Sequence, residues 1–196
     1  LLTQATKWNE PSLTTNTLDL ALGAAYALVS VGRDEEAFAL SRDALALPRV
    51  ESDLAQRWLA FRFARELGLI ERRRGHLDAA TGWYEQTRAL WRPKLRDAPG
   101  ELAWLLAEEI HVARLQGKPE LVLAHSDDFA RELGATKDKW AKEEAEFVWA
   151  ERAVALVQVG RLDEVDAALE RLPARPAMLA TRSLALRARV MLAQAR

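Results

Sequence analysis

The chain has 196 residues, of which 49% are hydrophobic and 29% are charged, and its net charge is −1. This composition excludes an intrinsically disordered chain, and the near-neutral charge gives no general attraction to nucleic acid or anionic membranes. Cysteine is absent, which excludes disulfides and thiolate metal sites. No apolar run approaches the roughly 18 residues of a membrane-spanning helix. No signal-peptide pattern opens the chain, and we expect a cytoplasmic protein.

Strong helix formers, above all Ala, Leu, Arg and Glu, fill the chain, and no alternating β-branched run interrupts them. Proline and glycine divide the sequence into segments of helical length. In chain order, the predicted helices span 14–31, 34–47, 53–74, 77–92, 100–116, 119–133, 137–159, 163–172 and 176–195.

Several residues mark the expected helix ends. Ser52 and Thr136 precede predicted helices and suit N-cap positions. Pro119 and Pro176 are expected in the first turn of a helix, where no backbone N–H is needed. Gly134, like Gly75 and Gly160, is expected to end a helix in the left-handed conformation.

Four of the glycines recur at a fixed interval. Gly32, Gly75, Gly117 and Gly160 are separated by 43, 42 and 43 residues, and each opens a similar phrase. A fixed period of this size indicates an array of stacked repeats. Each period is expected to hold two antiparallel helices, with the glycine at the turn between them. The pairs are 14–47, 53–92, 100–133 and 137–172, with partial units at 1–8 and 176–196.

The second pair carries a family resemblance. Its Leu67-Gly68, Gly75, Ala80-x3-Tyr84 and Pro93 resemble the tetratricopeptide (TPR) pattern L-G…A-x3-F…P. The small Gly68 and Ala80 would let two helices cross closely, while Tyr84 would fill the space between neighbouring pairs. The resemblance implies an all-α fold, a right-handed TPR-like α-solenoid of antiparallel helix pairs.

The match departs from the common pattern in two ways. Ala64 and Glu71 replace its leading Trp and its helix-one Tyr, and the other pairs are more degenerate. The period of 42–43 residues also exceeds the usual TPR length of about 34. Longer repeats of this kind resemble those in sensor arms of bacterial transcription regulators and signalling ATPases. We therefore expect a single repeat domain over 1–196 and a fragment of a larger protein.

The residues that suggest chemistry do not form a site. Glu108-x-x-His111 places two metal-binding side chains on one face of a helix, but the motif occurs once and no second histidine accompanies it. His125-Ser126-Asp127 holds the residue types of a hydrolase triad on one helix, where they cannot converge as a triad requires. Phosphate-, dinucleotide- and zinc-protease motifs are missing. We therefore expect no enzyme, no catalytic residues, no metal and no cofactor.

Aromatic and basic side chains are the candidates for binding. The 7 tryptophans either wedge between stacked helices or, in part, line a ligand groove. Arginines at 62, 65, 72 and 73 fall on one stripe of their helix, which is either a solvated face with local charge pairing or part of a groove. In TPR arrays the first helix of each pair lines the concave face. Aligning the first helices of the pairs by their glycines then predicts a partner-binding groove of Arg62, Arg65, Leu69, Arg72, Arg73, Trp104, His111 and Arg114.

These expectations favour a protein–protein interaction or scaffold module, the TPR-like arm of a bacterial regulatory protein. Its concave groove would bind a peptide or protein segment, with apolar anchors and an arginine stripe that orients the ligand. The alternative is a small-molecule effector-sensing domain of a transcription regulator. This fragment is expected to bind neither nucleic acid nor membrane directly.

Overall fold

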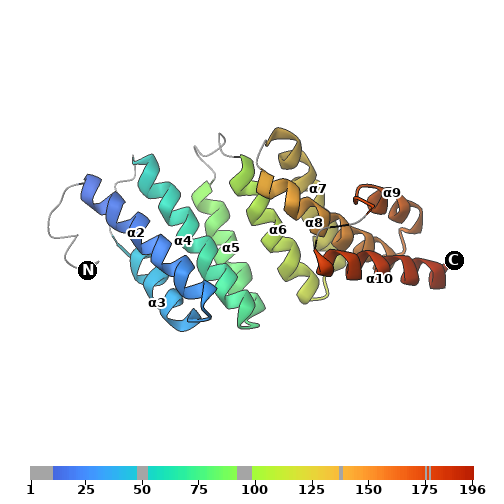
Figure 1. The fold of residues 1–196 in the computed structure, drawn as a ribbon, viewed down its shortest axis with the longest axis horizontal. Helices are drawn as coiled ribbons and strands as arrows, with labels where there is room; N and C mark the ends of the chain where they lie inside the picture. Colours follow the sequence, from blue (N-terminus) through green and yellow to red (C-terminus); the bar gives the residue numbers. More distant parts are fainter. Residues whose placement is uncertain (1–10, 48–52, 92–98, 137–138, 175, 177) are drawn as a thin grey trace. The chain divides into compact units, whose positions relative to one another are not determined.

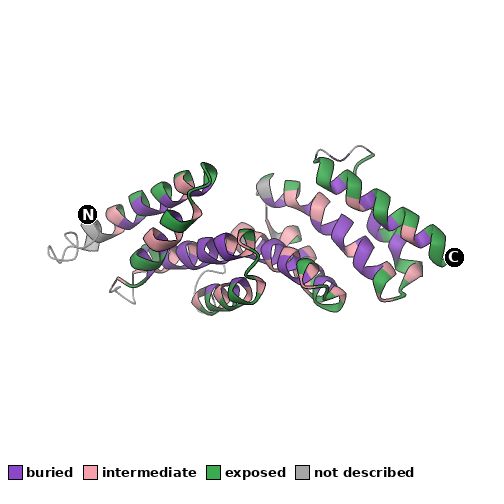
Figure 2. Ribbon diagram, turned by 90° about the horizontal axis from the view of Figure 1, so that it is seen from below, coloured by how far each residue is buried: buried purple, intermediate pink, exposed green. Residues whose placement is uncertain are grey.

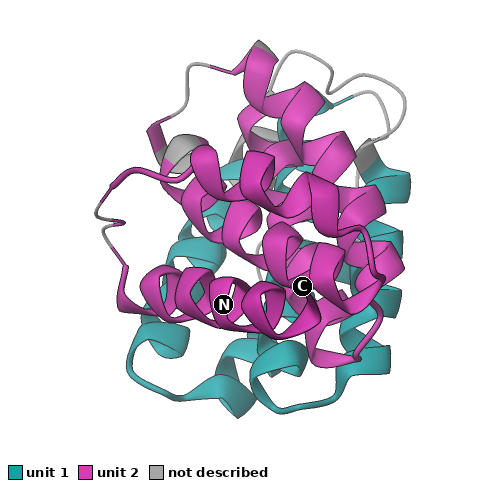
Figure 3. Cartoon of the chain, turned by 90° about the vertical axis from the view of Figure 1, so that its right-hand side faces the viewer, with its two compact units in different colours: residues 1–97 teal, residues 98–196 magenta. Residues whose placement is uncertain are grey.

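The computed structural model describes residues 11–47, 53–91, 99–136, 139–174, 176 and 178–196 (Figure 1). Within these ranges the protein is all-helical and contains no strand, as the composition predicts. The chain divides into two compact units, Leu1–Asp97 and Ala98–Arg196 (Figure 3). The single repeat domain over 1–196 stays a prediction. No helix in the described ranges has the length and apolar character needed to cross a bilayer.

The described residues of the first unit form four helices. They are α2 (Pro11–Ser30), α3 (Asp34–Leu45), α4 (Leu54–Arg73) and α5 (Leu77–Trp91). α4 is the central element, because it packs against α2, α3 and α5. Its Leu59, Phe63 and Leu67 are buried together with Leu22 of α2 in the core of the unit.

The second unit is also all-helical over its described residues, but its first two helices are equally long. It contains α6 (Pro99–Leu115), α7 (Pro119–Ala135), α8 (Lys139–Gln158), a 3-10 turn η2 (Leu162–Glu164), α9 (Val165–Glu170) and α10 (Leu179–Ala195). α8 is central here, packed against α6, α7, α9 and α10. Ile110, Phe129, Val148 and Leu156 belong to its core.

The four periodic glycines end helices in the same way. Gly32, Gly75, Gly117 and Gly160 have φ values of 76°, 81°, 67° and 77°. In each case the glycine N–H and the next N–H bond back to carbonyls of the last helical turn, as Gly75 N to Arg72 O (3.0 Å) and His76 N to Glu71 O (2.9 Å) do. This pair of bonds is the Schellman motif. It needs a residue in the left-handed conformation, which glycine adopts without steric cost. The predicted turns at Gly75 and Gly160 are confirmed.

Other boundary predictions need correction. Gly134 lies inside α7, which continues to Ala135, so it does not adopt the predicted left-handed cap. Pro176 lies before α10 rather than in its first turn, because the helix begins only at Leu179. Pro119 does occupy the first turn of α7. The predicted cap Ser52 lies outside the described residues, and the observed N-cap of α4 is Asp53, whose Oδ1 accepts from Ala55 N and Gln56 N.

Thr136 is also not an N-cap in the structure. It is the extended residue that follows the C-terminus of α7, and α8 begins at Lys139. The preference of threonine for N-caps does not distinguish the end of one helix from the start of the next when only a few residues separate them.

Helices α4 and α5 approach each other closely at Gly68. A Cβ placed on Gly68 would lie 2.3 Å from Cε1 of the buried Tyr84 ring. Only a residue without a side chain leaves room for this ring, which explains the Gly68…Tyr84 part of the repeat pattern. The ring fills the space between the two helices of its own pair.

Candidate binding site

The eight predicted groove residues divide between the two units. Five lie on α4 in the first unit, and Trp104, His111 and Arg114 lie on α6 in the second. The structure gives the contacts of each set within its own unit. The groove that would join them stays a prediction.

Arg62 is held between two aromatic rings. Its guanidinium carbon lies 5.2 Å from the centroid of Tyr26 and 4.5 Å from that of Trp58. Its Nε donates a hydrogen bond to the Tyr26 hydroxyl (3.1 Å). Cation–π contacts and the hydrogen bond together fix the orientation of this arginine, so it joins α4 to α2.

Arg65 is the most buried member of the stripe. Only 1% of it is exposed, and its Nη2 donates to the same Tyr26 hydroxyl (3.2 Å). A fully buried arginine is rare and has to be paired. Arg65 therefore belongs to the packing between α2 and α4 in this structure.

Arg73 and Arg74 connect the C-terminal end of α4 to the last turn of α2 and the first turn of α3. Arg73 Nη1 donates to the Val29 carbonyl oxygen (3.2 Å), and its Nε lies 3.2 Å from Asp34 Oδ2. Arg74 forms ion pairs of 2.9 Å with Glu35 and with Glu71. The pairing of Glu71 with Arg74 agrees with the helical geometry expected from their spacing of three residues.

The remaining α4 members keep part of their surface accessible. Leu69 and Arg72 are each half-buried, and the Arg73 side chain is 39% exposed. Arg62 is half-buried as well, but Tyr26 and Trp58 already hold its guanidinium. Leu69, Arg72 and Arg73 are therefore the predicted α4 residues best placed to meet a ligand in the first unit. They define the accessible α4 face.

In the second unit, Trp104 and His111 are half-buried on α6. The His111 ring stands edge-on to Phe147 of α8, with centroids 4.4 Å apart. His125 lies near Glu109, with Nδ1 and Oε2 3.6 Å apart. Within the described residues, no group of three or more His, Asp or Glu side chains is arranged to hold a metal ion.

Arg114 forms an ion pair between its Nε and Oε1 of Glu151 on α8. Glu151 is 1% exposed. Burial raises the pKa of Glu151 from 4.5 to about 7, and the charges of Arg114 and Arg187 oppose this rise. These three residues bring together α6, α8 and α10.

A small cavity of about 80 Å³ adjoins this ion pair. Its lining includes Arg114, Lys118, Glu151, Gln158 and Arg187. By the volume that a water molecule occupies in the liquid, the cavity has room for two or three waters, or for a very small anion.

A second cavity in this unit is a larger, open groove of about 430 Å³. One wall is the segment after α9, with Leu172, Pro173, Ala174 and Pro176, and the other is α10, with Arg182, Ala185, Leu186 and Arg189. Arg182 Nε donates to the Pro176 carbonyl oxygen (2.6 Å) and so ties the two walls together.

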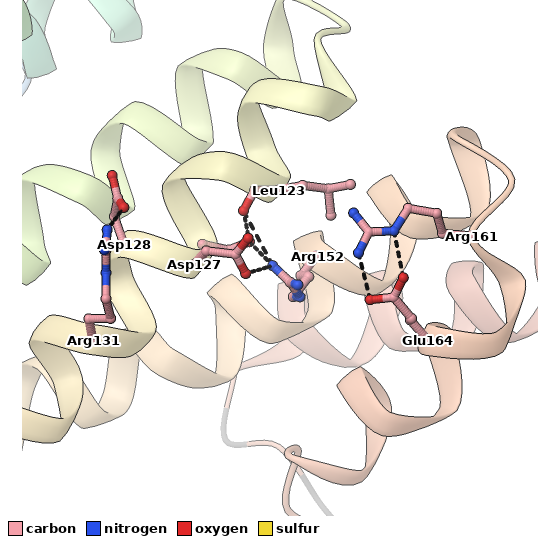
Figure 4. Close-up of polar contacts among 8 residues, drawn as sticks. Leu123, Asp127, Asp128, Arg131, Arg152, Arg161 and Glu164 are labelled. Atoms are coloured by element: carbon pink, nitrogen blue, oxygen red, sulfur yellow. Dashed lines mark hydrogen bonds and ion pairs between the residues drawn. The ribbon is translucent and has the colours of Figure 1, made fainter.

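Two of the three residues that resemble a hydrolase triad, Ser126 and Asp127, contact Arg152, which Figure 4 shows beside Asp127 and Leu123. Arg152 of α8 donates to Ser126 Oγ (2.7 Å) and to the Leu123 carbonyl oxygen (3.3 Å), and it lies 2.7 Å from Asp127 Oδ1. Ser126 Oγ in turn donates to the Leu123 carbonyl oxygen (2.9 Å). These contacts attach α7 to α8, and they leave Ser126 without the geometry of a nucleophile.

The sequence did not indicate Glu151, Arg187 or the groove beside α10. Glu151 and Arg187 are ordinary charged residues in helical segments, and their meeting depends on how α8 and α10 pack. The groove depends on the path of the chain between α9 and α10, which local residue preferences do not define.

Comparisons with models of protein families, with curated proteins and with solved structures found no match for this chain.

Proposed function

We propose that the chain is a TPR-like interaction module, a right-handed solenoid of antiparallel helix pairs that binds a peptide or protein segment. The observation that carries the proposal is the fourfold repetition of one helix–glycine turn–helix unit with the same Schellman bonds. Stacked helix pairs form extended surfaces that repeat proteins use for binding. The repeat length resembles that of regulatory arms in bacteria, which favours a cytoplasmic, signalling role.

Within the first unit, the accessible α4 face is the part of the predicted groove best placed for this role. Leu69 offers an apolar anchor beside the cationic Arg72 and Arg73. Arginine recognises carboxylates through paired N–H donors, so this face favours a segment with an acidic residue next to an apolar one.

A random-peptide display selection on the full chain tests this function. We expect enriched peptides that combine acidic and apolar residues, and loss of their binding in a Leu69→Ser/Arg72→Glu variant. The matched control is Leu20→Ser/Arg42→Glu, because Leu20 is 76% exposed on α2 and Arg42 is an exposed arginine of α3. If no peptide is enriched, or if both variants retain binding equally, the proposal is wrong.

The second candidate is a small-molecule effector site at the Arg114–Glu151–Arg187 cavity. The specific observation is a buried carboxylate next to three cationic side chains, with Lys118 as the third. Trp149 lies on the same helix as Glu151, so a saturable change in tryptophan fluorescence with small carboxylates, and not with peptides, would favour it. An Arg187→Gln variant should abolish that change.

A further inference from the structure

The strongest unassigned feature is the exposed face of α10 (Figure 2). Leu179, Leu186 and Val190 are 79%, 63% and 49% exposed. At about 100° per residue they fall within an arc of roughly 40° on the helix. The opposite side of α10 holds the buried residues Thr181, Ala185, Ala188 and Leu192, which attach the helix to its unit.

Arginines run beside this apolar row. Arg182 and Arg189 are one heptad apart, as are Leu179 and Leu186, so each leucine precedes an arginine by three residues. Both arginines line the 430 Å³ groove. Between Leu179 and Ala195, α10 has no Asp or Glu, and no carboxylate is among the described residues that line the groove.

From this arrangement we infer that α10 and the neighbouring groove dock an acidic amphipathic helix of a partner protein. Apolar residues of that helix would lie on Leu179, Leu186 and Val190. Its carboxylates, spaced by a heptad, would meet Arg182 and Arg189, which are about 10 Å apart along α10. The inference rests on the proposed binding function, and it adds a partner class and a surface other than the accessible α4 face.

Other occupants fit the surface less well. A second copy of α10 would bring the arginine rows of two chains together, and like charges at an interface are unfavourable. A membrane surface favours a broad apolar face with aromatic residues, whereas this row is narrow and α10 has no aromatic residue. A narrow apolar row bordered by charge is typical of helix–helix contact.

The test uses the full chain and two labelled synthetic helical peptides of about three heptads. Both peptides carry leucines at heptad spacing, one flanked by glutamates and the other by lysines. By fluorescence anisotropy, we expect the glutamate peptide to bind and the lysine peptide to bind at least about tenfold more weakly.

Two exposed positions supply the variants. Arg189→Glu should weaken binding of the glutamate peptide by about tenfold or more and strengthen that of the lysine peptide, and Leu186→Ser should weaken both. Arg42→Glu and Leu20→Ser are the matched controls, which should leave binding within about twofold. Arg182 is left intact, because its bond to Pro176 O supports the groove, and circular dichroism confirms that each variant is folded.

Several results would overturn the inference. One is equal binding of the two peptides, and another is unchanged binding by the Arg189→Glu and Leu186→Ser variants. A third is a chain that binds neither peptide but forms dimers that Leu186→Ser abolishes. Binding to anionic phosphatidylserine vesicles without binding to the glutamate peptide would assign the surface to membranes instead. Peptides that depend on Leu69 and Arg72 but not on Leu186 would leave the proposed function standing and refute only the α10 site.

Discussion

At the scale of single residues, glycine has two distinct uses in this chain. At Gly160 it permits a positive φ with open space around the missing side chain. At Gly68 it makes room for Tyr84, and a Cβ there would meet three ring carbons at less than 3.0 Å. The first use concerns the backbone of the turn, and the second concerns packing between α4 and α5.

Gly68→Ala should therefore destabilise the protein despite the higher helix propensity of alanine. Overpacking against the buried Tyr84 ring is expected to cost about 1–3 kcal/mol. The matched control is Gly82→Ala on α5, where nothing lies within 4 Å of the added Cβ and a gain of up to about 1 kcal/mol is expected. Urea unfolding monitored by circular dichroism measures both. Equal effects of the two substitutions would refute the packing role of Gly68.

At the scale of elements, one arginine attaches α7 to α8. The side chain of Arg152 is 14% exposed and meets Asp127, Ser126 and the Leu123 carbonyl oxygen. Hydrogen bonds to charged groups in partly buried positions contribute more to the free energy of unfolding than exposed ion pairs do. Arg131 and Asp128 form an ion pair on the exposed side of the same α7 helix (Figure 4).

Arg152→Ala should lower the free energy of unfolding by about 2 kcal/mol, because it removes the charged donor of the buried Ser126 hydroxyl and the ion pair with Asp127. Arg131→Ala should change it by less than about 0.5 kcal/mol, as expected for an exposed pair. Hydrogen exchange of the α7 amides provides a local readout. If exchange in α7 is the same in both variants, Arg152 does not attach the helix.

Element boundaries were largely predictable, because their signals are local. Glycine turns, first-turn prolines and acidic residues act within a few positions of the helix end. Gly134 was wrongly predicted because glycine alone does not end a helix when the residues around it continue the helical bonding. The burial of Arg65 was not predictable, since its partner Tyr26 is 39 residues away and only the packing of α2 against α4 brings them together.

At the scale of the whole molecule, repetition is the dominant property. The same Schellman turn recurs at all four periodic glycines. The bidentate pair Arg33–Glu36 after the first turn has a counterpart in Arg161–Glu164 after the last. The periodic sequence therefore predicts turns well, while contacts that occur once, such as Arg114–Glu151, depend on the particular helices that pack together.

The buried Glu151 gives the stability of the whole chain a distinctive pH dependence. Because its pKa is about 7 in the folded protein and 4.5 ordinarily, the folded state binds this proton more tightly than the unfolded state. The contribution of this proton to the free energy of unfolding is therefore complete below about pH 4.5 and is lost as the pH rises through about 7. The largest value that this contribution can reach is about 3 kcal/mol.

Glu151→Gln should remove this component while it keeps the shape of the side chain. The difference in unfolding free energy between variant and wild type is expected to grow in favour of the variant between pH 4.5 and 7.5, as measured by urea unfolding across that range. Glu164→Gln is the control, because hydrogen bonding to Arg161 lowers the pKa of Glu164. Its contribution to stability is therefore lost only below about pH 4.5, and the difference between this variant and wild type should stay nearly constant from pH 4.5 to 7.5. A difference between Glu151→Gln and wild type that stays constant with pH would show that Glu151 titrates near its ordinary pKa, and that Arg114 and Arg187 fully offset its burial.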